Sequence, residues 1–167
     1  KNICGQRFYN NKRCKSWDEY RKEFSSVGNK VRGEYSILYI YDKKAMLEIK
    51  KLYPNIKVIL SIRDPVDYLY SSYWFMRYSN AGYKVKKDFC EAVLNSSSDK
   101  LYNLKKARYC EPIKNCLEVF GEESTHLIFL TDIRTKPENV LRDLYKFLGV
   151  SESFVPDAKD RIINRTR

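Results

Sequence analysis

Residues 57–73 read Lys57-Val-Ile-Leu-Ser-Ile-Arg63-Asp-Pro-Val-Asp-Tyr-Leu-Tyr-Ser71-Ser-Tyr73. The apolar run from Lys57 to Ile62 has no clean alternation, and this pattern is typical of a strand that is buried on both faces of a parallel sheet. Asp64 is a good N-cap and Pro65 a good first helical residue, so we expect a helix from about Val66 to Tyr78. A strand that runs directly into a helix predicts the α/β class.

Strand and helix signals continue to alternate along the chain. Asp42 precedes a helical pattern that ends before Pro54, and residues 126–130 form a second buried strand-like run. A helix is expected from Pro137 to Leu148, with Gly149 closing it. We interpret residues 1–167 as a single domain, an α/β fold with a parallel sheet flanked by helices. The other expected elements are a helix at 17–27, a short strand or extended segment at 35–41, a helix near 86–94, and a helix at about 101–120 that is interrupted or restarted at Pro112.

The chain is strongly basic. Its formal net charge is +11, from 32 Lys and Arg against 21 Asp and Glu. A surplus of this size attracts polyanions in general, including nucleic acid, anionic membranes, sulfated glycans and multiply phosphorylated nucleotides, and it does not choose among them. The longest apolar run, at 58–62, is far shorter than the roughly 18–20 residues that cross a bilayer, so no transmembrane segment is predicted.

The cysteines and the single histidine give little support for a metal site. No CxxC pair is present and His126 stands alone, so no metal is expected. In an oxidising compartment Cys4 could pair with Cys14, or Cys110 with Cys116. The alternative, of about equal weight, is that the cysteines are free thiols.

Arg63 and Ser71 form the most informative pair of polar side chains. The strand delivers Arg63 to the carboxyl edge of the sheet, where α/β folds bind ligands. The helix that begins at Pro65 adds the positive end of its dipole and free backbone N–H donors near the same edge. Ser71 follows two helical turns later, so a guanidinium and a hydroxyl could reach one phosphate. The alternative is that Arg63 caps the strand end and Ser71 packs against a neighbouring helix.

This unit resembles the 3′-phosphate-binding motif of sulfotransferases, an Arg-x-Pro followed by Ser at the same offset. It is most similar to the carbohydrate type, the heparan sulfate sulfotransferases and their bacterial relatives. The resemblance implies that Arg63 and Ser71 hold the 3′-phosphate of the donor 3′-phosphoadenosine 5′-phosphosulfate (PAPS). At the end of the chain, Asn164-Arg165-Thr166-Arg167 looks like the family's Asn-x-Thr-Lys before a donor-binding loop, which implies that Arg167 approaches the nucleotide phosphates.

Other segments match the family in order and spacing. Residues 33–39, Gly-Glu-Tyr-Ser-Ile-Leu-Tyr, resemble its Gly-Glu-x-Ser-Pro-x-Tyr, and 109–120, 126–132 and 137–149 resemble its late helix, strand and Phe-Leu-Gly helix. The family's first strand, P-loop-like glycine-rich turn and helix have no counterpart here. The resemblance therefore implies a P-loop-NTPase-like sheet missing that first unit, with this chain as the C-terminal part of a longer domain. No catalytic base can be assigned; Glu34 is the nearest candidate, and a structural role suits it better.

These features predict a PAPS-dependent sulfotransferase that transfers a sulfuryl group to a hydroxyl or amine of a glycan or small acceptor. The alternative is a non-catalytic, sulfotransferase-derived protein that binds a nucleotide or another anion. Nucleic acid is not expected as a partner because no known binding pattern is present, and a P-loop kinase would need GxxxxGK[ST]. Two triplets that match the glycosylation sequon, at 95–97 and 164–166, favour the Golgi lumen or secretory pathway slightly over the cytoplasm. The basic residues that would line a groove for an anionic glycan, or else form solvated helix faces, are Lys84, Lys86, Lys87, Lys105, Lys106 and Arg108.

Overall fold

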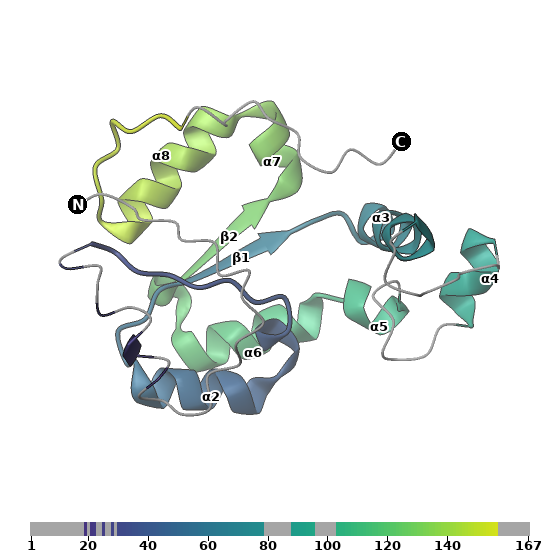
Figure 1. Ribbon diagram of the computed structural model, residues 1–167, viewed down its shortest axis with the longest axis horizontal. Coiled ribbons are helices and arrows are strands. Elements are labelled where there is room, and N and C mark those ends of the chain that lie inside the picture. The colour runs from purple at the N-terminus through teal and green to yellow at the C-terminus, as the bar shows by residue number, and fades with distance from the viewer. Residues whose placement is uncertain are drawn as a thin grey trace.

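The computed structural model describes residues 19, 21, 22, 25, 28, 30–78, 88–95 and 103–156. The helix expected at 17–27 lies mostly outside these residues. The described elements, drawn in Figure 1, are η2 (Tyr39–Tyr41), α2 (Lys43–Leu52), β1 (Val58–Ile62), α3 (Pro65–Tyr78), α4 (Phe89–Leu94), α5 (Leu104–Ala107), α6 (Cys110–Phe120), η3 (Glu122–Ser124), β2 (Thr125–Phe129), α7 (Leu130–Thr135) and α8 (Pro137–Leu148).

Two parallel strands form the sheet. β1 pairs with β2 in a register that places Val58 opposite Thr125 and Ile62 opposite Phe129. Both strands point the same way, and β1 runs on into α3 while β2 runs on into α7 (Figure 1). Helices α2 and α6 lie on one side of the sheet, and α7 and α8 lie on the other. The predicted α/β fold, a parallel sheet flanked by helices, is confirmed.

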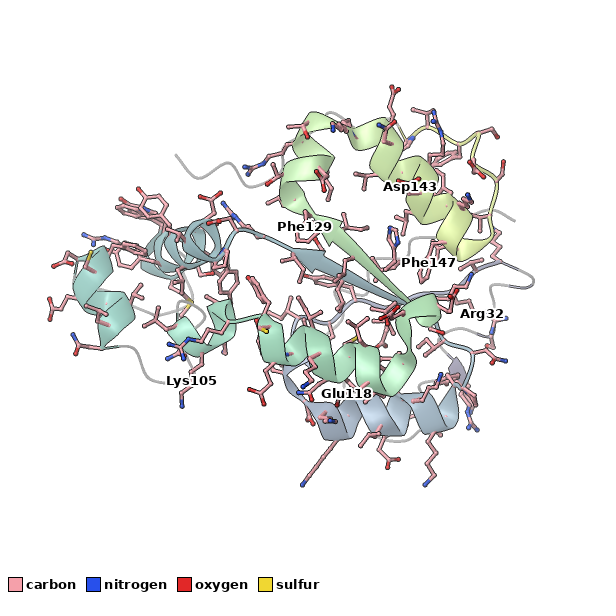
Figure 2. All side chains as sticks on the ribbon, turned by 180° about the vertical axis from the view of Figure 1, so that it is seen from behind. Arg32, Lys105, Glu118, Phe129, Asp143 and Phe147 are labelled. Carbon is pink, nitrogen blue, oxygen red and sulfur yellow. The ribbon has the colours of Figure 1, made fainter. Side chains whose placement is uncertain are left out.

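Helices α2 and α6 cover one face of the sheet. The Asp42 side chain accepts a hydrogen bond from the backbone N–H of Ala45 at 3.0 Å, so α2 begins at the predicted cap, and it ends before Pro54 as expected. On the outer surface, Lys43 of α2 forms an ion pair with Glu118 of α6 at 2.7 Å (Glu118 is labelled in Figure 2). The buried side chains between these helices and the sheet are Met46, Leu60, Ile62, Cys116 and Phe120.

Helix α8 covers the opposite face, above β2. It has the predicted bounds and ends at Gly149, whose φ of 71° lies in the left-handed region that favours glycine. The rings of His126 and Phe147 stack with centroids 5.0 Å apart and connect α8 to β2 (Phe147 is labelled in Figure 2). Ile59 of β1 is 40 % exposed, so the prediction that this strand is buried on both faces is wrong for the described residues. The physical reason is that α8 packs against β2 and leaves the outer part of β1 uncovered.

A second apolar cluster lies beyond the carboxyl end of β1. Helix α3 starts at Pro65, one residue before the predicted start, and packs against α4 and α5 (Figure 1). Asp88 caps α4, which is shorter than the expected helix near 86–94. The members of this cluster are Leu69, Tyr73, Met76, Ala92, Val93 and Ala107.

Two local predictions are wrong. The segment at 35–41 is not a strand at its end, because Tyr39–Tyr41 winds into a 3₁₀ turn whose last bond, from the N–H of Asp42 to the carbonyl of Tyr39, sets up the cap of α2. The expected long helix at 101–120 breaks at Arg108 and Tyr109 and not at Pro112. Pro112 sits in the first turn of α6, where a missing N–H has no intrahelical partner to lose.

Candidate functional site

Arg63 occupies the position that the sequence predicts, directly after β1 at the carboxyl edge of the sheet. Its side chain is half-buried, and its Nε is buried without a hydrogen-bond partner among the described residues. A buried donor left unpaired is costly, and more so when the group is charged. The site is therefore suited to an acceptor that the protein itself does not provide, such as an oxygen of a bound anion.

Asp64 accepts hydrogen bonds from the backbone N–H groups at the start of α3. Its Oδ1 accepts from the N–H of Val66 at 2.9 Å and of Asp67 at 3.0 Å, and its carbonyl accepts from the N–H of Tyr68 at 2.8 Å. Pro65 has no N–H to offer. The predicted N-cap is confirmed, but the expectation of free backbone donors here is wrong, because the cap itself occupies them. An anion at this edge would be bound by side chains.

Ser71 lies in the second turn of α3 and is half-buried. Its position is six residues past Pro65, or about 9 Å along the helix axis. At about 100° per residue, it lies on the side of α3 away from Leu69 and Tyr73, which face the apolar cluster. The structure thus places Arg63 and Ser71 on one strand–helix unit, with Arg63 at the helix start. Arg167, the third predicted donor-binding residue, lies outside the described residues.

Three tyrosines gather around one another, and one of them, Tyr109, lies close to Arg63; the sequence analysis did not identify them. Tyr68 of α3 and Tyr109, between α5 and α6, meet edge to face with ring centroids 6.0 Å apart. Tyr41 of η2 lies close to both, and burial, followed by these two neighbours, raises the pKa of its phenol. We call Tyr41, Tyr68 and Tyr109 the tyrosine cluster. It is assembled from three distant parts of the chain, so a local pattern could not have signalled it.

The tyrosine cluster should make the fold sensitive to alkaline pH. Burial first, and then Tyr68, raises the pKa of Tyr109 to about 12, although the nearby Arg63 guanidinium lowers it. Because the folded chain holds this proton more tightly than the unfolded chain, the contribution is complete below about pH 10 and is lost as the pH rises from there to about 12. We expect Tyr109→Phe, which cannot ionise, to lose less stability across this window than the wild type. Urea titrations below and within the window measure the difference, and equal slopes for both proteins would contradict the expectation.

Glu34 forms a side-chain hydrogen bond with Tyr39. Burial, then a hydrogen bond with Glu34, raises the pKa of Tyr39 to about 12. This pairing joins the exposed segment before η2 to the 3₁₀ turn itself. It is a structural contact of the kind that the sequence favoured for Glu34, and it assigns no catalytic base.

The cysteines do not form the pairing considered for α6. Cys90, Cys110 and Cys116 are free. Cys110 and Cys116 are six residues apart on one helix, or about 9 Å along its axis, which exceeds the roughly 7 Å Cα separation that a disulfide can span. Cys4 and Cys14 lie outside the described residues.

The described residues contain neither a metal-binding cluster nor a membrane-spanning helix. Among the residues that the structure describes, no group of His, Cys, Asp or Glu side chains is arranged to hold a metal ion. Within the same ranges, no helix combines the length and apolar character needed to cross a membrane. Of the basic residues singled out in the sequence, Lys105 and Arg108 are exposed at α5 and Lys106 is half-buried there (Lys105 is labelled in Figure 2), whereas Lys84, Lys86 and Lys87 lie outside the described ranges.

Comparison with known proteins identifies a family and a similar solved structure. The family model described as sulfotransferase domain matches residues 42–167. Among solved structures, the chain is similar to a sulfotransferase from Alicyclobacillus acidocaldarius, with 26% sequence identity and a TM-score of 0.71. That match covers 90% of this chain and 63% of the other, so the chain spans less than two thirds of the length of this relative. No curated protein matches.

Proposed function

Because this chain belongs to the sulfotransferase family, we propose that it takes part in transferring a sulfuryl group from PAPS to a hydroxyl or amine of a glycan or small acceptor. The observation that carries the proposal is the buried, unpaired Nε of Arg63 at the carboxyl end of β1. A phosphate oxygen at this point would supply the missing acceptor. Family membership supports PAPS as the source of that phosphate.

In this proposal Arg63 and Ser71 anchor the 3′-phosphate. Sulfuryl transfer resembles phosphoryl transfer, in which positioning and electrostatic stabilisation do most of the catalytic work. The two side chains set the register of the donor without touching the reacting sulfur. Arg167 is proposed to approach the same nucleotide.

The acceptor is proposed to be anionic. The net charge of +11 favours a glycan that carries carboxylate or sulfate groups. Lys105 and Arg108 are exposed and lie within a few residues of Tyr109 in the sequence, so they are candidates for contacts with the acceptor. A secretory location, such as the Golgi lumen, fits a glycan acceptor and is part of the same proposal.

The deciding experiment is transfer of radiolabelled sulfate from PAPS to a panel of glycans and small hydroxyl or amine acceptors. We expect label in at least one acceptor, with heparan-type glycans tested first. A chain that binds adenosine 3′,5′-bisphosphate but transfers no label to any acceptor would support the non-catalytic alternative. A chain that neither binds the bisphosphate nor transfers label would overturn the proposed function.

A further inference from the structure

Tyr41 makes a hydrogen bond that ties two distant parts of the chain together. Its hydroxyl donates to the backbone carbonyl of Lys106 at 2.7 Å, across 65 residues of sequence. Lys106 belongs to the last turn of α5, where helix carbonyls have no partner within the helix. Tyr41 therefore satisfies one of the carbonyls that α5 leaves open.

Helix α5 needs such a contact. It has only four residues, and helices much shorter than about 12 residues are not stable by themselves. The chain leaves α5 at Arg108 and passes through Tyr109 before α6 begins. A restraint on Lys106 therefore also restrains Tyr109, three residues later, and Tyr109 is the residue that packs edge-on against Tyr68.

The restraint on Tyr109 also concerns the surroundings of Arg63. Tyr109 lies close enough to Arg63 for the guanidinium to lower the pKa of its phenol. Its neighbour Tyr68 is in the first turn of α3, where its backbone N–H donates to the carbonyl of the cap residue Asp64. Tyr109, which packs against Tyr68, is thus the member of the tyrosine cluster that lies close to Arg63 and its buried Nε. Tyr109 lies at the junction between α5 and α6, and the hydroxyl of Tyr41 is bonded to the α5 side of that junction.

We propose that Tyr41 is a positioning residue for nucleotide binding: its hydroxyl holds the end of α5 so that Tyr109 stays beside Arg63 and the 3′-phosphate pocket keeps its shape. This inference rests on the proposed function. Tyr41 itself is assigned no contact with the ligand. A side chain in this role affects recognition of the 3′-phosphate more than recognition of the rest of the nucleotide.

The test compares Tyr41→Phe with Tyr39→Phe in the full chain. Both variants lose one phenolic hydroxyl from η2, but the Tyr39 hydroxyl bonds to Glu34 and not to α5. We expect Tyr41→Phe to bind adenosine 3′,5′-bisphosphate about three- to tenfold more weakly, the range that loss of one hydrogen bond gives. Tyr39→Phe should bind as the wild type does. Isothermal titration with the bisphosphate and with adenosine 5′-phosphate measures both affinities, and only the first should change in Tyr41→Phe.

A merely structural role would give a different result. If Tyr41→Phe lowers the Tm without ligand and weakens both nucleotides equally, or if it binds both as the wild type does, the inference is wrong. A second readout needs no variant: bound bisphosphate should slow amide hydrogen exchange at 104–109 in the wild type, and adenosine 5′-phosphate should not. Absence of that protection also counts against the inference. A wild-type chain with no affinity for the bisphosphate overturns the proposed function together with this inference, and so is distinguishable from failure of Tyr41 alone.

Discussion

Arg63→Ala should remove most or all of the stabilisation of this chain by adenosine 3′,5′-bisphosphate. At a ligand concentration of about 100 times Kd, binding should stabilise the wild type by about 2.7 kcal/mol. For a chain of this size that corresponds to a rise in Tm of roughly 5–10 °C. Removing a charged donor from a phosphate costs about 2–5 kcal/mol, so at the same concentration the variant should keep at most about a third of the shift, and none at the upper end of this range. Differential scanning fluorimetry with and without the ligand measures the effect.

Matched controls separate the 3′-phosphate from general electrostatics. Arg142→Ala removes the same charge from an exposed position on α8 and should keep the full shift. Arg63→Lys keeps the charge but loses the forked geometry of the guanidinium, so its shift should be reduced and not absent. If adenosine 5′-phosphate raises the Tm of the wild type as much as the bisphosphate does, the 3′-phosphate assignment is wrong.

The ligand-free variant also tests the structural alternative for Arg63. If Arg63 only closed the end of β1, its removal would lower the Tm in the absence of nucleotide. The structure argues for the opposite sign, because Nε is buried without a partner and an unpaired donor destabilises the fold. We therefore expect ligand-free Arg63→Ala to be as stable as the wild type or more so. The unpaired Nε of Arg63 lowers the free energy of unfolding of the ligand-free chain, and an anion bound to Nε would remove this cost.

Local chemistry explains which parts of the fold could be predicted from the sequence. The strand–helix unit at 57–78 was placed within a residue at its boundaries, because Asp64 and Pro65 define a helix start by their own side chains. In the same way, Asp42 marks the start of α2 and Gly149 marks the end of α8. The position of Arg63 follows from that local order. Capping residues act within a few positions, so reading them requires no knowledge of the tertiary structure.

The parts that could not be predicted depend on contacts across the chain. The tyrosine cluster joins residues 41, 68 and 109, and only the folded chain brings them together. The exposure of Ile59 depends on where α8 lies over the sheet, which its sequence does not reveal. The expectation of free N–H donors at the start of α3 is wrong for a different, local reason. Asp64 is the predicted cap, and a capping side chain itself occupies the N–H groups of Val66 and Asp67.

Tyr73→Ala should lower the free energy of unfolding by about 3–5 kcal/mol, the range for removing a large ring from a packed interior. Tyr73 is 1% exposed and lies at the centre of the cluster that fixes α3 against α4. Its ring meets those of Trp74 and Phe89 at centroid distances of 5.1 and 5.5 Å, and its hydroxyl accepts a hydrogen bond from Arg77. Deleting the ring removes these contacts together and leaves a cavity behind Ser71. Urea denaturation followed by circular dichroism measures the loss.

Phe75 provides the matched control for Tyr73, because it is an aromatic residue on the same helix that is 61% exposed. Phe75→Ala should change the free energy of unfolding by no more than about 0.5 kcal/mol. Tyr73→Phe keeps the ring and loses the hydroxyl that bonds to Arg77, so its effect should fall between the two. If Tyr73→Ala and Phe75→Ala are equally destabilising, α3 is not anchored through its Tyr73 face, and the placement of Ser71 on the opposite side fails with it. If the large difference is found, the same helix has one face that holds the fold together and another that contributes little to stability, as a phosphate site at Ser71 requires.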